Sequence, residues 1–113
     1  MNLLSSLFGT PVPTIQPQEA QERLNKTPRP FLLDVREPSE FRSASIPGAT
    51  LIPSGELASQ FKRLPKDKEI LVICASGSRS TSATRQLIAA GYNATNIQGG
   101  MFSWMRAGLP VKR

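Results

Sequence analysis

A chain of 113 residues has the length of one ordinary domain, and its 39% hydrophobic and 19% charged residues are typical of a globular protein rather than a disordered or fibrous one. The net charge of +6 raises nucleic acid as a partner, but the one basic cluster, "KRLPKDK", has no aromatic residue that could stack on bases, so we expect no nucleic-acid partner. No apolar run approaches the length of a membrane span, and the start lacks the basic region and cleavage pattern of a signal peptide, so we expect a cytoplasmic protein with no membrane partner.

Short apolar segments alternate with amphipathic ones along the first part of the chain. Residues 1–13 show no sustained period and predict a flexible arm, ahead of a single domain over residues 14–113. A continuous apolar run, "FLLDV", predicts a strand buried on both faces, and Leu57, Phe61 and Leu64 recur at helical spacing. In order, we expect an extended segment at Ile15, a helix from Pro17 and a strand over 31–35. After them we expect a short helix at Phe41, a turn over 46–49 and a strand over 50–53. A helix capped by Ser54 follows and ends before Pro65.

The second half of the chain continues this alternation. The run "EILVIC" is the most strand-like of all, since three of its four apolar residues are β-branched, and it places Cys74 at the end of the strand. The segment "STSATRQLIAAG" predicts a helix with Ala83, Leu87 and Ala90 on one face and Gly91 at its end. After it we expect a strand over 94–98, a tight turn at Gly99 and Gly100, and a terminal helix over 101–111 that carries Phe102, Trp104 and Met105. The alternation predicts an α/β fold with a central parallel sheet of about five strands and helices on both faces.

The only cysteine lies where such a sheet binds its ligands, at the carboxyl end of a strand. Cys74 is followed by "ASGSRS" and a helix N-terminus, so unpaired backbone N–H groups and the positive end of the helix dipole face the sulfur. Gly77 allows a positive φ and Arg79 adds a charge, so we expect a lowered pKa and a reactive thiolate rather than an inert buried cysteine. With one cysteine and no histidine, we expect no disulfide, no metal site and no cofactor.

Four motifs occur in order and together resemble a single-domain rhodanese, a member of a sulfurtransferase family. They are "LLDVREPSEF", "IPGATLIP", "LVICASGSRS" and "QGGMFSWMRAGLPV", and the resemblance runs from about Thr14 to Val111. It implies a rhodanese-like α/β fold. It also implies that Cys74 attacks the outer sulfur of a small anionic donor such as thiosulfate, becomes a persulfide, and passes that sulfur to cyanide or a thiol.

The resemblance also assigns roles by position. Cys74 is the nucleophile, and Arg79 orients the loop or the donor. The residues implied to bind the donor form the loop after Cys74: Ala75, Ser76, Gly77, Ser78, Arg79 and Ser80. Asp34, Arg36 and Glu40 match the family's first motif as neighbours of the site, where we interpret them as an ion-pair network that orders the end of a strand. Because the sequence has no second cysteine, the acceptor must be an external small thiol, cyanide or a partner protein's cysteine.

Two residues depart from the family's pattern. Ala75 stands where many relatives have arginine, so the pocket has one charge fewer and thiosulfate is expected to be a poor substrate. Ser45 stands where the family usually has histidine before "IPGA", and we expect this loss to be tolerated.

Two other functions stay open from the sequence. A cysteine phosphatase or arsenate reductase also places a thiolate and an arginine on a loop between strand and helix. Those enzymes have five residues between the two, whereas Cys74 and Arg79 enclose four, "ASGS", and no general acid is evident. A binding or sulfur-relay module could use the fold without turnover, an alternative that the presence of Cys74 disfavours.

Overall fold

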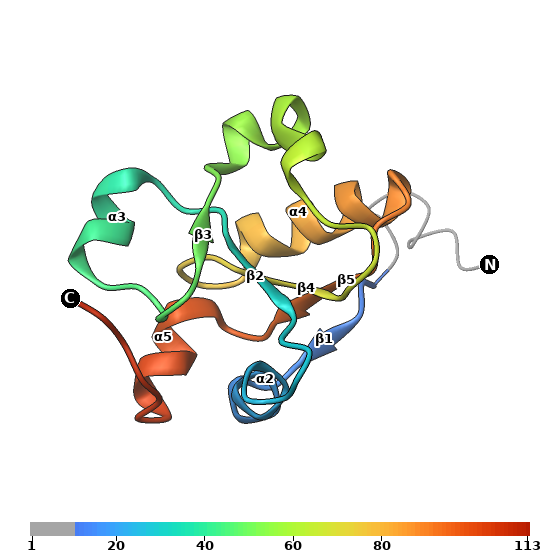
Figure 1. The fold of residues 1–113 in the computed structure, drawn as a ribbon. Coiled ribbons are helices and arrows are strands. Elements are labelled where there is room, and N and C mark those ends of the chain that lie inside the picture. Colours follow the sequence, from blue (N-terminus) through green and yellow to red (C-terminus); the bar gives the residue numbers. More distant parts are fainter. Residues whose placement is uncertain (1–10) are drawn as a thin grey trace.

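Five parallel strands form one sheet in the order β1-β5-β4-β2-β3 (Figure 1). The computed structural model describes residues 11–113, so most of the expected N-terminal arm, residues 1–10, lies outside the described part. The strands are β1 (Thr14–Ile15), β2 (Phe31–Asp34), β3 (Thr50–Leu51), β4 (Ile70–Ile73) and β5 (Ala94–Ile97). The helices are α2 (Pro17–Leu24), α3 (Pro38–Ser43), the 3₁₀-helix η1 (Ser54–Arg63), α4 (Ser78–Ala89) and α5 (Gly100–Arg106).

Helices cover both faces of this sheet, and each face has its own apolar core. On one face η1 and α4 pack Leu57, Ala83 and Leu87 against the strands. On the other face α2 and α5 contribute Ala20, Leu24, Met101 and Trp104. The predicted α/β class with a five-stranded parallel sheet is therefore confirmed. Within residues 11–113, none of the helices combines the length and the apolar character that a bilayer crossing needs.

The central strand β4 aims the cysteine at one particular face. Successive side chains of a strand point to opposite faces, so Ile70 and Val72 enter the core beside α4 while Leu71 and Ile73 enter the core beside α2 and α5. Cys74 follows Ile73 and continues the alternation toward α4. The sulfur is therefore directed to the face where the next helix begins.

One predicted helix differs in its winding. Residues Ser54–Arg63 form a 3₁₀-helix rather than an α-helix, with hydrogen bonds that span three residues, such as Leu64 N–H to Phe61 O at 3.0 Å. Leu57 is the one fully buried side chain of this segment. The shorter repeat of a 3₁₀-helix still brings Leu57 and Phe61 to the core beside α4.

Two other helices differ in length. The helix α4 begins at Ser78 rather than two residues later, because Gly77 supplies the cap. The last helix ends at Arg106 instead of continuing to residue 111, because Gly108 adopts a φ of 72° and Pro110 has no N–H to donate. On that shorter helix Trp104 is fully buried, whereas Phe102 is 62% exposed.

Candidate active site

Cys74 is the first residue after β4 and lies at the mouth of the loop that leads into α4. Its side chain is buried, with 0% of the residue exposed. Gly77 caps α4 with a φ of 111°, a conformation that residues with a Cβ rarely adopt. This glycine lets the chain turn within three residues from the end of the strand to the start of the helix, so the loop closes tightly around the sulfur.

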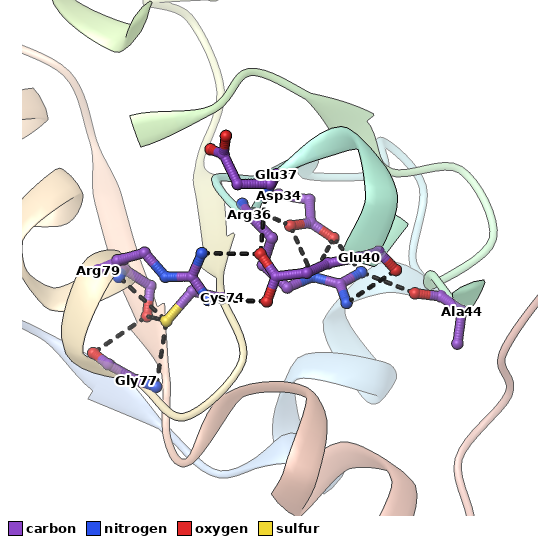
Figure 2. A network of polar contacts seen from close by, with 9 residues as sticks. Asp34, Arg36, Glu37, Glu40, Ala44, Cys74, Gly77 and Arg79 are labelled. Carbon is purple, nitrogen blue, oxygen red and sulfur yellow. Dashed lines mark hydrogen bonds and ion pairs between the residues drawn. The ribbon is translucent and has the colours of Figure 1, made fainter. Parts of the chain in front are cut away.

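Two backbone N–H groups and one hydroxyl lie within 3.3 Å of the sulfur atom (Figure 2). The Gly77 N–H donates to Sγ at 3.1 Å and the Ser80 N–H donates to it at 3.3 Å. The Ser80 hydroxyl oxygen also lies 3.3 Å from Sγ. Both N–H groups belong to the start of α4, where backbone donors have no acceptor inside the helix. The first turn of the helix therefore directs its free donors at one sulfur atom.

These contacts favour the ionised form of the thiol. Burial raises the pKa of Cys74, but hydrogen bonds from the Ser80 hydroxyl and from the N–H groups of Ser80, Gly77 and Ser76 outweigh it, so the net pKa is lowered. A thiolate is the nucleophilic form of cysteine. The loop therefore forms a cradle for a nucleophilic sulfur.

The start of α5 holds the same loop from the other side. Met101 N–H donates to Cys74 O at 2.8 Å, and Phe102 N–H donates to Ala75 O at 3.1 Å. A Cβ on Gly100 would lie 2.4 Å from Cys74 O and 2.6 Å from Ala75 O, so a larger residue would push α5 off the loop. The sequence predicted only a turn at this glycine, whereas the structure shows that it also permits the close approach of α5 to the cysteine.

Arg79 is engaged by a carboxylate from α3. Its Nη1 and Nη2 donate to the two carboxylate oxygens of Glu40 at 2.8 Å and 3.0 Å, and Glu37 N–H donates to Glu40 Oε1 at 2.8 Å (Figure 2). The hydrogen bonds from Arg79 lower the pKa of Glu40 to about 2, and the same carboxylate raises the pKa of Arg79. About a third of each side chain is exposed, so this ion pair lies at the rim of the site.

Asp34 and Arg36 form a second, fully buried ion pair. Arg36 Nε donates to Asp34 Oδ1 at 3.0 Å and its Nη2 donates to Oδ2 at 2.8 Å. Arg36 also donates to the carbonyl oxygens of Ala44 at 2.7 Å and Glu40 at 3.3 Å, which ties α3 to the end of β2. The pair therefore supports the helix that carries Glu40.

The remaining predicted residues form the outside of the loop or lie apart from it. Ser76 and Ser78 are exposed, and neither hydroxyl bonds the sulfur; Ser76 contributes its backbone N–H, and Ser78 begins α4. Ala75 is half-buried and presents only a methyl group. Ser45 is buried in a backbone bridge with Lys112, with N–H to O distances of 2.9 Å and 2.7 Å in the two directions. Ser45, which stands where the family usually has histidine, therefore joins the domain to its C-terminal segment through backbone hydrogen bonds.

One residue close to the sulfur was not predicted. The Asn96 side chain lies on β5, is 4% exposed, and accepts a hydrogen bond from Ser80 Oγ at 2.6 Å. The sequence carries a signal for it, namely a carboxamide inside the short buried strand "ATNI". A buried polar group of this kind needs a specific partner, but the sequence alone does not say which.

Comparisons with known proteins show what this chain is similar to. A family model described as "Rhodanese-like domain" matches residues 16–107. A sulfurtransferase of Allochromatium vinosum is 34% identical over 98 residues, which cover 86% of this chain and 92% of that protein. The putative sulfur carrier protein YrkF of Bacillus subtilis is 34% identical over 101 residues, covering 88% of this chain and 55% of that protein. The crystal structure of a rhodanese-related protein from Thermoplasma volcanium matches with a TM-score of 0.83 and 37% identity, over 88% of this chain and 97% of the other.

Proposed function

Because this chain belongs to the rhodanese-like family, whose relatives include named sulfurtransferases, we propose that it transfers a sulfane sulfur through a persulfide on Cys74. The observation that carries the proposal is the set of donors around one sulfur, the N–H groups of Gly77 and Ser80 at 3.1 Å and 3.3 Å. Donors at this distance stabilise an anionic sulfur more than a neutral one. The thiolate that starts the reaction carries this charge on Sγ itself, and the persulfide carries it on its outer sulfur.

The chemistry consists of two displacements at sulfur. In the first, the Cys74 thiolate attacks the outer sulfur of the donor, a new S–S bond forms, and the electron pair of the broken donor bond departs with the leaving group, which is sulfite when the donor is thiosulfate. In the second, an acceptor thiolate or cyanide attacks the outer sulfur of the persulfide, and the electron pair of the broken bond returns to Sγ. In both steps the leaving group departs as a stable anion, sulfite or a thiolate, so neither step requires a general acid.

The charges beside the loop favour a donor of low charge. Asp34, Arg36, Glu40 and Arg79 form two ion pairs whose charges cancel, and Ala75 adds none. Once Cys74 is ionised, the site is therefore net negative toward an arriving donor. A small persulfide carries less charge than thiosulfate, so we propose thiosulfate as the weaker of the two donors.

The acceptor is proposed to come from outside these 113 residues, because Cys74 is the only cysteine. A small thiol, cyanide or a partner protein's cysteine would serve, and the similarity to a putative sulfur carrier protein supports relay to a partner. A thiol that must stay reduced between turnovers also suits a reducing compartment, and for this reason we propose the cytoplasm.

Intact mass spectrometry tests the proposal directly. The protein is incubated with thiosulfate or with a small-molecule persulfide, and the expected result is a gain of one sulfur atom that cyanide or excess thiol removes. The matched control is Cys74→Ser, which should gain nothing. Absence of a labile sulfur from every donor tried would contradict the proposal.

An aryl phosphate separates sulfur transfer from phosphatase chemistry. The tight loop already directs its Gly77 and Ser80 N–H groups at Sγ, and only four residues separate Cys74 from Arg79. We therefore expect the native protein to cleave an aryl phosphate no faster than Cys74→Ser does. Turnover that depends on Cys74, together with no sulfur uptake, would assign the site to phosphate esters instead.

A further inference from the structure

Asn96 is a buried amide that the sulfur chemistry described so far does not use. All four residues of β5 are buried, and Ala94 belongs to the core beside α4. Because side chains alternate along a strand, Asn96 points to the same face as Ala94. Its carboxamide therefore lies beneath the first turn of α4, within 2.6 Å of the Ser80 hydroxyl oxygen.

The Ser80 hydroxyl has one proton and more than one neighbour that could accept it. Asn96 Oδ1 lies at 2.6 Å, Gly77 O at 3.2 Å and Cys74 Sγ at 3.3 Å. The shortest of these contacts is the one to Asn96. In the thiol state the hydrogen bonds then run from sulfur to amide: the Cys74 S–H donates to Ser80 Oγ, and the Ser80 O–H donates to Asn96 Oδ1.

Loss of the thiol proton changes the hydrogen bonds that the sulfur can make. A thiolate only accepts hydrogen bonds, so the Ser80 O–H is better used toward Sγ than toward Asn96. If the hydroxyl turns, its lone pairs face Asn96 Oδ1 at 2.6 Å, and two acceptors at that distance repel. A half-turn of the carboxamide removes this conflict, because Nδ2 then donates to Ser80 Oγ. Asparagine provides both a donor and an acceptor at one position.

We propose that Asn96 is a positioning residue that acts through Ser80, its carboxamide turning over so that the hydroxyl donates to Sγ whenever the sulfur is anionic. The thiol proton passes to water, while Ser80 keeps its own proton and only changes its direction. The proposal rests on the sulfurtransferase function, in which Cys74 has to give up its proton to become the attacking thiolate. Hydrogen bonds linked in this way strengthen one another, so the amide reinforces the bond from Ser80 to the sulfur.

The charged groups near the sulfur come from other elements. Arg79 on α4 and its partner Glu40 on α3 lie at the rim, and the Asp34–Arg36 pair follows β2. Of these, Arg79 interacts electrostatically with Cys74. The start of α5 meets the loop through backbone groups, and β5 presents the neutral Asn96. A change at Asn96 therefore leaves every one of these charges in place.

A double-mutant cycle tests whether Asn96 acts through Ser80. The readout is the ultraviolet absorbance of the Cys74 thiolate against pH, which needs no reagent to reach a fully buried sulfur and no sulfur donor. Asn96→Leu is expected to raise the titration midpoint of Cys74 by about one pH unit. The reason is that the Ser80 hydroxyl, without its partner Asn96, would stabilise the thiolate less well. In a Ser80→Ala background the same change should leave the midpoint where it is.

Thr95→Val is the matched control. Thr95 is the buried neighbour of Asn96 on β5, but its hydroxyl donates to Glu69 at 3.0 Å, so its loss should not move the Cys74 midpoint. An equal shift from Asn96→Leu in both backgrounds, or no shift in either, would overturn the proposal. Asn96→Val, whose branched side chain suits a strand, repeats the cycle with a smaller side chain.

A measurement on the unaltered protein covers the case in which neither variant folds. The side-chain amide resonances of Asn96 should shift in NMR spectra with the midpoint of the Cys74 titration, while those of the exposed Gln98 stay constant. Constant Asn96 resonances through that titration would overturn the proposal. Because these readouts follow proton loss alone, a normal result combined with no sulfur uptake would instead contradict the proposed sulfur transfer.

Discussion

Replacing Glu40 with glutamine tests whether the charge balance beside the loop sets the choice of donor. In the native protein the Glu40 carboxylate binds both Nη atoms of Arg79, so this arginine contributes no net charge to an arriving anion. Glutamine has nearly the same shape and can still accept a hydrogen bond from Arg79, but it removes one negative charge. The site then gains a net positive charge at the rim, and a dianionic donor should bind better.

The size of this effect follows from Coulomb's law. For a unit charge about 10 Å from a dianion at an effective dielectric constant of about 20, the interaction is about 3 kcal/mol. Screening at physiological salt, with a Debye length of about 8 Å, reduces it to about 1 kcal/mol. We therefore expect Glu40→Gln to lower the KM for thiosulfate about fivefold. A singly charged persulfide should gain half that free energy, or about a twofold change.

Steady-state kinetics with both donors is the assay, and Glu22→Gln is the control. Glu22 is an exposed residue of α2, away from the α4 face, so its replacement changes the overall charge equally without changing the site. An equal change in KM from both substitutions would mean that total charge decides, and no change from Glu40→Gln would refute the local charge argument. A fall in thermal midpoint of a few degrees is expected as well, because a partly exposed ion pair contributes about 1 kcal/mol.

Three further predictions concern the loop and its supports. Arg79→Lys should lower kcat/KM for sulfur transfer about tenfold, because a single ammonium cannot reproduce the planar set of donors with which the guanidinium is expected to orient the loop and the donor; unchanged kinetics would make Arg79 a surface residue. Gly100→Ala should lower the free energy of unfolding by at least about 2 kcal/mol in urea titration, because its Cβ would meet Cys74 O at 2.4 Å, whereas Gly55→Ala, with no atom within 4 Å, should not. In acid, Glu40 has its pKa lowered from 4.5 to about 2, so its pair stabilises the fold above pH 4.5 and is lost as the pH falls toward 2; the Glu40→Gln variant should lack this part of the pH dependence.

Much of the fold could be predicted because a strand buried on both faces must be apolar throughout. The runs at residues 31–35 and 70–73 could therefore be predicted as strands, and the position of Cys74 at the end of the second run followed from chain order. The winding and the ends of helices were harder to predict from the sequence, because they depend on backbone conformation and capping rather than on the apolar pattern. The terminal helix stops at Arg106 because of the backbone conformation at Gly108, which the exposed or buried pattern of its side chains does not encode.

The site divides in the same way between local and distant contacts. The donors to Sγ come from residues three and six positions after Cys74, so the sequence of the loop was enough to predict a cradle. The contact of Arg79 with Glu40 spans 39 residues and matches a family motif rather than a local rule. The contact of Ser80 with Asn96 requires knowing that β5 pairs with β4 and which face Asn96 occupies, and neither can be read from a single short strand.

We expect the two layers of the site to act on different parts of the proposed reaction. Next to the sulfur, the Gly77 and Ser80 N–H groups are dipoles fixed by the start of α4, at distances too short for salt or solvent to weaken them. At the rim, the ion pair of Arg79 and Glu40 cancels its own charge and is partly exposed. The dipoles favour an anionic Sγ, whereas we expect the charges at the rim to discriminate among arriving donors. We therefore expect the reactivity of Cys74 to depend on its own loop, and the choice of donor to depend on the contact of Arg79 with Glu40 of α3.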